Sequence, residues 1–470
     1  MTLNNKINKN SIIQISGKLL SLFFGLATVA IMTRYLGQEG FGYYITVVAF
    51  LQFFGILVDF GISLTTVQMI SDLRRNVSDV LSNILTLRVI FSIIFLGLAP
   101  IIIWFFPYPM VVKLGVLITS FSFFCITIIQ VLTGMFQREL KMLDVTIAEI
   151  VGRVLLLVMT IVIVFLGKSI LWIFLAISIG SFVNLIITYL YSRKYFIFKW
   201  SFDFSVWKEV FQRTWPIALS ISFNLIYLKM DTIILSLTRS QSEVGLYGAT
   251  YRVIDILTNL PAVFMGIVLP HMTKYFIDNN KTELKNLMQN TFNSLMIFAV
   301  PIVVGTFLIA EKVMVFVAGS EFVDSGEILK VLILASGAIF FTSLFGYAVL
   351  AVHKQKVMMW GYLTTAVVTL AGYIYFIPKY GVWGAGWMTV FSEAVIAIWT
   401  FVVVYRETKF VPSFNVFIKG VFSSFVMLGV LYLIRDMHVL ILLGVACVVY
   451  FGVMYLIGGI RKGFWKESWK

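Results

Sequence analysis

Long apolar segments recur along the whole 470-residue chain, and they constrain its fold more than any other feature. A helix needs about 20 mostly apolar residues to cross a bilayer. Segments of about this length lie at 11–33, 43–67, 84–106, 111–135, 145–166, 170–191, 212–237, 245–269, 286–309, 327–351, 357–377, 383–405, 415–434 and 438–459. Only 12% of the residues are charged, against about 25% in soluble domains. The pattern therefore predicts an all-α polytopic membrane protein with about 14 transmembrane helices.

Basic side chains are distributed unevenly between the loops that join these segments. When the loops are taken alternately from the N-terminus, about 21 Lys and Arg residues fall on the first set. The second set holds only Arg34, Lys168, Arg239, Lys312, Lys379 and Arg435. Because cytoplasmic loops are rich in Lys and Arg, this alternation predicts an even number of spans with both termini in the cytoplasm. It also explains the net charge of +14 without a nucleic-acid partner.

Two glycine-containing polar hairpins, at residues 34–44 and 239–248, suggest an internal repeat. Short basic turns at 134–141 and 350–356 also take the same place in each half. This spacing predicts two six-helix lobes in a pseudo-twofold repeat, with the substrate bound between them. The expected divisions are an N-terminal lobe at 1–194, a cytoplasmic amphipathic linker at 195–210, a C-terminal lobe at 211–406, terminal helices at 407–460 and a basic tail at 461–470.

The segment between the two expected lobes, residues 192–208, mixes basic and aromatic side chains. The aromatic ones include Tyr195, Phe196, Phe198, Trp200, Phe202 and Trp207. This composition is typical of a segment that lies in the headgroup layer of a membrane. We favour that interpretation over a binding site for a partner protein.

Ionisable residues interrupt the apolar segments at several positions. The basic ones of interest are Lys18, Arg88, Arg153, Lys229 and Arg252, and the acidic ones are Asp59, Glu149, Asp231, Asp255 and Glu393. Charges at membrane depth are costly, so they usually face a wet cavity or pair with one another. The expected depths allow Lys18 to pair with Asp59, and Asp231 with Arg252. The i,i+4 spacing of Glu149 and Arg153 places them on one helix face.

The functional interpretation depends on a surplus of cations in these helices. Lys18, Arg88, Lys229 and Arg252 outnumber the acids beside them, which predicts a cationic cavity for a phosphate or pyrophosphate, with Arg153 as a further candidate. The acids are candidates for pairing or for binding a coupling ion, H⁺ or Na⁺. A competing interpretation is that all these charges form closed ion pairs that lock each lobe.

The sequence contains no recognisable enzyme or metal site. Cys125 and Cys447 both lie inside apolar segments, with no metal-binding spacing. The three histidines are His271, His353 and His438. They lie far apart at loop edges, and a GxxxxGK[ST] phosphate loop is also missing. These features predict a transporter without a bound cofactor rather than an enzyme.

The first hairpin carries the motif R-Y-L-G-x-x-x-F-G-x-Y over residues 34–44. Together with residues 134–141, 230–235, 245–252 and 378–385, this motif resembles the polysaccharide transporter branch of the MOP flippase superfamily, the Wzx-type flippases. The resemblance extends over nearly the whole chain. It implies a V-shaped pair of six-helix lobes followed by two further helices.

Such flippases move undecaprenyl-pyrophosphate-linked sugar units from the inner to the outer leaflet of the bacterial cytoplasmic (inner) membrane by alternating access. The resemblance implies a role in O-antigen, capsule or exopolysaccharide synthesis. It implies the lipid-linked glycan, membrane lipids and a glycan polymerase as partners. Arg252, Arg88 and Lys18 are then expected to hold the pyrophosphate. Lipid II flippases have an Arg–Asp pair in helix one, whereas this helix has only Lys18, which favours a polysaccharide repeat unit.

Two other functions remain open from the sequence. A cation-coupled multidrug exporter of a related fold would need a lone buried carboxylate, and Asp59 or Glu393 fits that requirement. A membrane polymerase or ligase for the same glycans usually has a large outer loop. The expected outer loops are short, at most about 15 residues, which counts against the enzyme.

Overall fold

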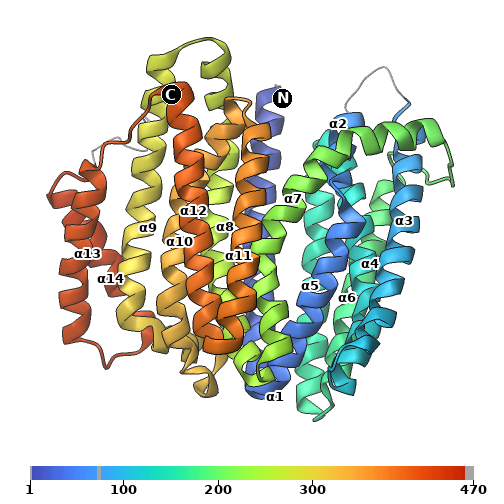
Figure 1. The fold of residues 1–470 in the computed structure, drawn as a ribbon, viewed down its shortest axis with the longest axis horizontal. Coiled ribbons are helices and arrows are strands. Elements are labelled where there is room, and N and C mark those ends of the chain that lie inside the picture. Colours follow the sequence, from blue (N-terminus) through green and yellow to red (C-terminus); the bar gives the residue numbers. More distant parts are fainter. Residues whose placement is uncertain (1–2, 71–75, 461–470) are drawn as a thin grey trace. The chain divides into compact units, whose positions relative to one another are not determined.

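The computed structural model describes residues 3–70 and 76–460, which fold into long helices joined by short turns (Figure 1). The helices are α1 Leu3–Asp59, α2 Ile62–Ile70, α3 Val77–Ile102, α4 Met110–Arg138, α5 Met142–Phe165, α6 Ile170–Ser192, α7 Phe204–Thr238, α8 Gln241–Ile277, α9 Lys281–Ala318, α10 Ser325–Ala351, α11 Gln355–Tyr380, α12 Val382–Thr408, α13 Asn415–Leu433 and α14 Val439–Leu456. Short 3₁₀ turns lie at Ile103–Phe105 and Ser320–Phe322. The described ranges contain no strand, so the all-α class is confirmed.

Among the described residues, 12 helices are long and apolar enough to cross a membrane. Most of them lie where the hydropathy pattern predicts a segment. Ser16–Asp59 covers two of the expected segments, and α7, which contains the expected segment at 212–237, is not among the 12. The count of 14 spans and the cytoplasmic position of both termini remain predictions. Arg74 and Arg75, at 71–75, and the expected basic tail at 461–470 lie outside the described residues.

Helix α1 consists of two arms that meet at Gly37, where φ is 65° and ψ is −173°. Figure 1 shows the chain turning back between these arms. Glycine takes such a positive φ without steric cost. The second arm ends at Asp59, because Phe60 (φ 39°) and Gly61 (φ 76°) break the helix before α2. The sequence predicts an unbroken segment to residue 67, and the structure shows that this is wrong.

The first hairpin lies against the start of α8 with almost no space between the two backbones. A Cβ on Gly42 would lie 1.8 Å from the carbonyl oxygen of Gln241. A Cβ on Gly245 would lie 2.0 Å from the carbonyl oxygen of Gln38. The Thr46 hydroxyl also donates to Oε1 of Gln241 at 2.8 Å. The two hairpins that mark the repeat therefore touch each other, and glycine is what permits so close an approach.

The first compact unit comprises Met1–Gly245. Its helix α4 packs against α1, α3 and α6, while α5 packs against α1 and α6. Helix α7 packs against α1, α2 and α3, so it belongs to this unit by its contacts. The sequence places the lobe boundary earlier, at residues 194–211, and that division remains a prediction.

The second compact unit comprises Leu246–Lys470. Helix α10 packs against α9 and α12, and α11 packs against α12. The terminal helices α13 and α14 pack against α9 and against each other. Polar contacts fasten both ends of this terminal pair to α9. The Gln289 side chain bonds both the amide and the carbonyl of Ser413, and Lys312 donates to the carbonyl oxygen of Met437 at 2.9 Å.

Candidate functional site

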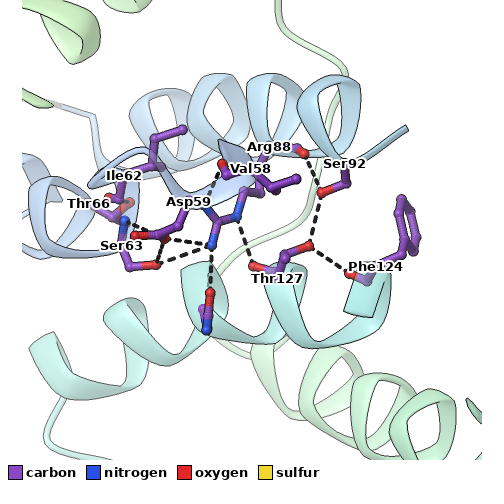
Figure 2. Close-up of polar contacts among 10 residues, drawn as sticks. Val58, Asp59, Ile62, Ser63, Thr66, Arg88, Ser92, Phe124 and Thr127 are labelled. Atoms are coloured by element: carbon purple, nitrogen blue, oxygen red, sulfur yellow. Dashed lines mark hydrogen bonds and ion pairs between the residues drawn. The ribbon is translucent and has the colours of Figure 1, made fainter. Parts of the chain in front are cut away.

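The Arg88 guanidinium occupies a buried position between α1, α3 and α4 (Figure 2). Its side chain has an exposed fraction of 0%. Nη2 lies 2.7 Å from Oδ1 of Asp59 and donates to Oε1 of Gln130 at 2.6 Å. Nη1 donates to the carbonyl oxygen of Val58 at 2.9 Å, and Nε donates to that of Thr127 at 3.1 Å. Each nitrogen of the guanidinium therefore has a partner.

This network stabilises the break between α1 and α2. A helix end leaves carbonyl groups without helical partners and carries a partial negative charge. Arg88 satisfies the Val58 carbonyl and neutralises the adjacent Asp59 carboxylate. The Ser63 hydroxyl, on α2, donates to the same carboxylate and accepts from Nη2 of Arg88 at 3.3 Å. The ion pair thus joins the ends of α1 and α2 to α3 and α4.

Two sequence-based expectations fail at this point. Arg88 is expected to face a cavity, but it is buried and engaged by protein groups. The expected depths allow Lys18 to pair with Asp59, but the carboxylate pairs with Arg88, and no ion pair joins the two described residues Lys18 and Asp59. The reason is the helix break, since it places the end of α1 and its carboxylate beside α3.

A different row of charges lies along the seam between α1 and α5. The Ser21 hydroxyl donates to Oε1 of Glu149 at 2.6 Å. A Cβ on Gly25 would lie 3.7 Å from Nη1 of Arg153, so the guanidinium lies over this glycine. Lys18, Ser21 and Gly25 follow i, i+3, i+7 spacing and share one face of α1. Lys18, Glu149 and Arg153 therefore follow one another along the seam.

The two cations of this seam are exposed within segments that have the composition of membrane spans. Lys18 and Arg153 both have exposed side chains, whereas Glu149 is half-buried. Gly25 lies seven positions after Lys18, which corresponds to about 10 Å along the helix. Glu149 and Arg153 lie on one face of α5, as their spacing predicts, and the structure shows that this face meets α1. The structure shows no ion pair between these two described residues, so the seam keeps an excess of positive charge.

Lys229 and Asp231 lie near one another on α7, in the first unit. Lys229 is half-buried, and Asp231 has an exposed fraction of 0%. The carboxylate of Asp231 accepts hydrogen bonds from the amide and the hydroxyl of Thr232. The expected pair of Asp231 with Arg252 joins residues of different units and remains a prediction.

The second unit holds the remaining candidates. Arg252 and Asp255 are half-buried on α8, and Glu393 lies on α12 with an exposed fraction of 4%. Within residues 3–70 and 76–460, no hydrogen bond or ion pair reaches the Glu393 carboxylate, although Tyr362 of α11 interacts with it electrostatically. A buried carboxylate without a cationic partner is costly when ionised. Glu393 is therefore suited to carry a proton.

A cluster of hydroxyl groups in the second unit is not apparent from the sequence. The hydroxyls of Tyr247, Tyr251 and Tyr373 lie 3.4, 3.4 and 3.2 Å from Oγ1 of Thr389. The i,i+4 spacing of the first two tyrosines signals a shared face of α8. Sequence alone does not show that this face meets α11 and α12. The described residues contain no group of three His, Cys, Asp or Glu side chains that could hold a metal ion.

Comparison with known proteins shows which family this chain belongs to. The model of the polysaccharide biosynthesis protein family matches residues 7–276, which is more than half of the chain. The chain belongs to this family. A relative described as an O-antigen transporter of Shigella dysenteriae is 21% identical over 384 residues, which cover 80% of this chain and 94% of its own length. A protein described as a low-salt glycan biosynthesis flippase of Haloferax volcanii is 24% identical over 36% of each chain.

Solved structures show the same fold for this member of the polysaccharide biosynthesis family. The lipid II flippase MurJ, in an inward closed conformation, has a TM-score of 0.78 at 17% identity, over 95% of this chain and 98% of that one. An inward-facing multidrug resistance MATE transporter of the MOP superfamily has a TM-score of 0.68 at 14% identity, over 85% and 98%. At these identities the similarity shows the fold, which is that of the MOP superfamily. The resemblance stated from the first hairpin is thus confirmed.

Proposed function

We propose that this chain is a flippase that carries a lipid-linked oligosaccharide across the cytoplasmic membrane of a bacterium for surface polysaccharide synthesis. The family match, the names of the two relatives and the transporter fold support this proposal. The observation that carries it is the row of exposed cations on the α1–α5 seam, inside segments suited to cross a membrane. Exposed cations at that depth are stable only beside water or an anion.

In this proposal the seam holds the pyrophosphate of an undecaprenyl-linked repeat unit. Arg153 supplies a planar fork for phosphate oxygens, and Lys18 supplies a point charge about 10 Å away along α1. Glu149, held by Ser21, limits the positive charge of the seam so that the substrate is not bound too tightly to leave. Lys229, on α7 of the same unit, is proposed as a further contact. Arg88 is not proposed again, because it is buried and already paired.

The proposed cycle is alternating access of the pyrophosphate while the prenyl tail stays in lipid. Coupling to an H⁺ gradient is proposed through Glu393, which is buried without a cationic partner among the described residues. Na⁺ coupling would draw on Asp255 or Asp231 instead. The product, a repeat unit in the outer leaflet, is the substrate that a glycan polymerase would take.

The test replaces the exposed cations of the seam in a strain that depends on this chain for surface polysaccharide. Lys18→Ala and Arg153→Ala should each reduce surface polysaccharide at least tenfold, since each removes a charge-assisted contact worth about 1.5–3 kcal/mol. Lipid-linked repeat units should accumulate in the inner leaflet, while the protein level stays unchanged.

Lys281→Ala is the matched control, because Lys281 is an exposed lysine at the start of α9, outside the seam. This variant should make normal amounts of polysaccharide. Full activity of both seam variants would refute the assignment of the pyrophosphate to α1 and α5. Loss of activity without accumulation of lipid-linked units would refute the flippase itself.

A cation-coupled multidrug exporter is the second candidate function, and the position of Glu393 favours it. Of the two carboxylates that the sequence offers for this function, Asp59 is neutralised by Arg88, so only Glu393 remains. Expression in a drug-sensitive strain distinguishes the two functions. An exporter raises drug resistance in a way that Glu393→Gln abolishes, whereas a dedicated glycan flippase leaves resistance unchanged.

A further inference from the structure

The segment between α6 and α7, residues 193–203, is not helical, and we call it the strap. Two backbone amides fasten it to α3 in the first unit. The Ser201 amide donates to Oγ1 of Thr86 at 3.2 Å, and the Asp203 amide donates to Oδ1 of Asn83 at 2.8 Å. Both acceptor side chains are buried. These two hydrogen bonds therefore fix the position of the strap along α3.

The strap presents a row of aromatic side chains on its outer side. Phe196 turns inward and joins the core, whereas Trp200 and Phe202 have exposed fractions of 60% and 57%. The rings of Trp200 and Phe202 stack with centroids 6.4 Å apart, and Phe198 meets Trp200 edge-on at 5.1 Å. Phe204, 74% exposed, extends the row onto α7. Such a row would be unfavourable in water but suits the boundary between headgroups and acyl chains.

Basic side chains flank this aromatic row. Arg193, Lys194, Lys199 and, on the first turns of α7, Lys208 are all exposed. The nearby acid Asp203 is occupied as the N-cap of α7, since its Oδ1 accepts from the Ser205 amide at 2.8 Å. Hydrogen bonds from the Ser205 hydroxyl and amide lower the pKa of Asp203, so its charge is held at the helix end. The surface of the strap is left strongly positive.

The level of the strap relative to the spans supports a headgroup location. The span from Val77 to Phe105 has 29 residues, which makes it about 43 Å long at 1.5 Å per residue. A hydrocarbon core is about 30 Å thick, so the ends of this span extend beyond it. The strap bonds to Asn83 and Thr86, which lie roughly 9 and 13 Å from the first residue of the span and so within the about 13 Å by which its length exceeds the core. It also begins directly after the last residue of α6, Ser192.

We propose that the strap is a binding surface for anionic phospholipid headgroups of the membrane that the chain crosses. The aromatic rings lie at the acyl boundary, and the four basic side chains bind the lipid phosphates. Because the strap is bonded to α3 through buried side chains, bound lipid stabilises the packing of the first unit. This surface is distinct from the α1–α5 seam, and its function does not depend on the flippase activity.

The test is lipid binding by the full chain reconstituted in nanodiscs. Spin-labelled phosphatidylglycerol is titrated into phosphatidylcholine, and quenching of tryptophan fluorescence is followed. The wild type should show saturable quenching, and Trp200→Phe should lose the largest part of it. The combined variant Lys194→Gln, Lys199→Gln, Lys208→Gln should bind roughly a hundredfold more weakly, because each basic side chain near an anionic surface contributes about fivefold.

A matched control carries Lys281→Gln and Lys285→Gln, which remove lysines from α9 of the second unit. It should bind anionic lipid as the wild type does. Anionic lipid should also raise the thermal midpoint of the wild type but not that of the triple variant. Equal binding by the triple variant and the control would overturn the proposal. An identical stabilisation by inorganic phosphate alone would also overturn it, because the ligand would then be free phosphate rather than lipid.

Discussion

Arg88 shows how one side chain can hold a discontinuity in a membrane helix. Its three nitrogens meet a carboxylate, an amide oxygen, a hydroxyl and two backbone carbonyls, a set that suits the planar fork of a guanidinium. The competing interpretation from the sequence, that buried charges form closed ion pairs, therefore holds for Arg88 and Asp59. It does not hold for Lys18 and Arg153, which stay exposed.

Replacement of Arg88 should destabilise the protein much more than replacement of a surface arginine. Arg88→Ala leaves the Asp59 carboxylate without a cationic partner and removes the donor to the Val58 carbonyl, so we expect a loss of about 3–5 kcal/mol. Arg88→Lys should recover only part of this, since an ammonium has three donors and no fork. The thermal midpoint of the purified protein in detergent measures both effects.

Arg213→Ala is the control for this experiment. Arg213 forms an i,i+4 salt bridge with Glu209 at 2.7 Å, and its side chain is 47% exposed. Exposed pairs contribute about 0–1 kcal/mol, so this variant should melt close to the wild type. Similar midpoints for Arg88→Ala and Arg213→Ala would show that the buried network does not stabilise the break.

The identity of the charged residues could be predicted from the sequence, but their partners could not. The apolar segments mark which ionisable residues lie at membrane depth, and every candidate charge does lie on a helix. Pairing depends on the rotation of each helix about its axis and on breaks such as Phe60–Gly61. Hydropathy contains neither kind of information. For this reason the sequence predicts that Asp59 can form an ion pair, but it does not identify Arg88 as the partner.

At the scale of elements, the two hairpins have a role beyond turning the chain. The sequence explains their glycines by tight turns, and Gly37 fits this explanation with its positive φ. Gly42 and Gly245 serve a different purpose, because each faces a backbone carbonyl of the other hairpin. Contact between two distant segments is not encoded in the local pattern of either one.

Gly42→Ala should therefore disrupt the crossing of the hairpins. A Cβ at this position would lie 1.8 Å from a backbone oxygen, so the backbone must move, at a cost of roughly 1–3 kcal/mol. Gly266→Ala, in α8, is the matched control, since nothing lies within 4 Å of its Cβ position. It should be neutral or stabilising by up to about 1 kcal/mol. Equal thermal midpoints for the two variants would argue against the close contact.

At the scale of the whole molecule, the hydropathy pattern predicts the helices of the fold more closely than the charged residues predict the contacts of the site. Long helices follow from the need to satisfy every backbone amide and carbonyl inside lipid. The resemblance carried by the first hairpin and four further segments correctly indicated the family. That hairpin lies where segments about 200 residues apart meet. The amino-acid composition does not predict the orientation of the chain in the membrane. That prediction rests on the charges of the loops.

The loop charges predict that Lys168 lies outside the cell and Lys281 inside, with both termini in the cytoplasm. We expect Lys168→Cys to react with a membrane-impermeant maleimide in right-side-out vesicles, and Lys281→Cys to react only after permeabilisation. The exposed Cys447 is first replaced by serine, while Cys125 is buried and does not interfere. Both target lysines are exposed at helix ends or in turns, so a difference in labelling reports the side of the membrane rather than burial. Labelling of Lys281→Cys in sealed vesicles would contradict the predicted orientation, in which both termini lie in the cytoplasm.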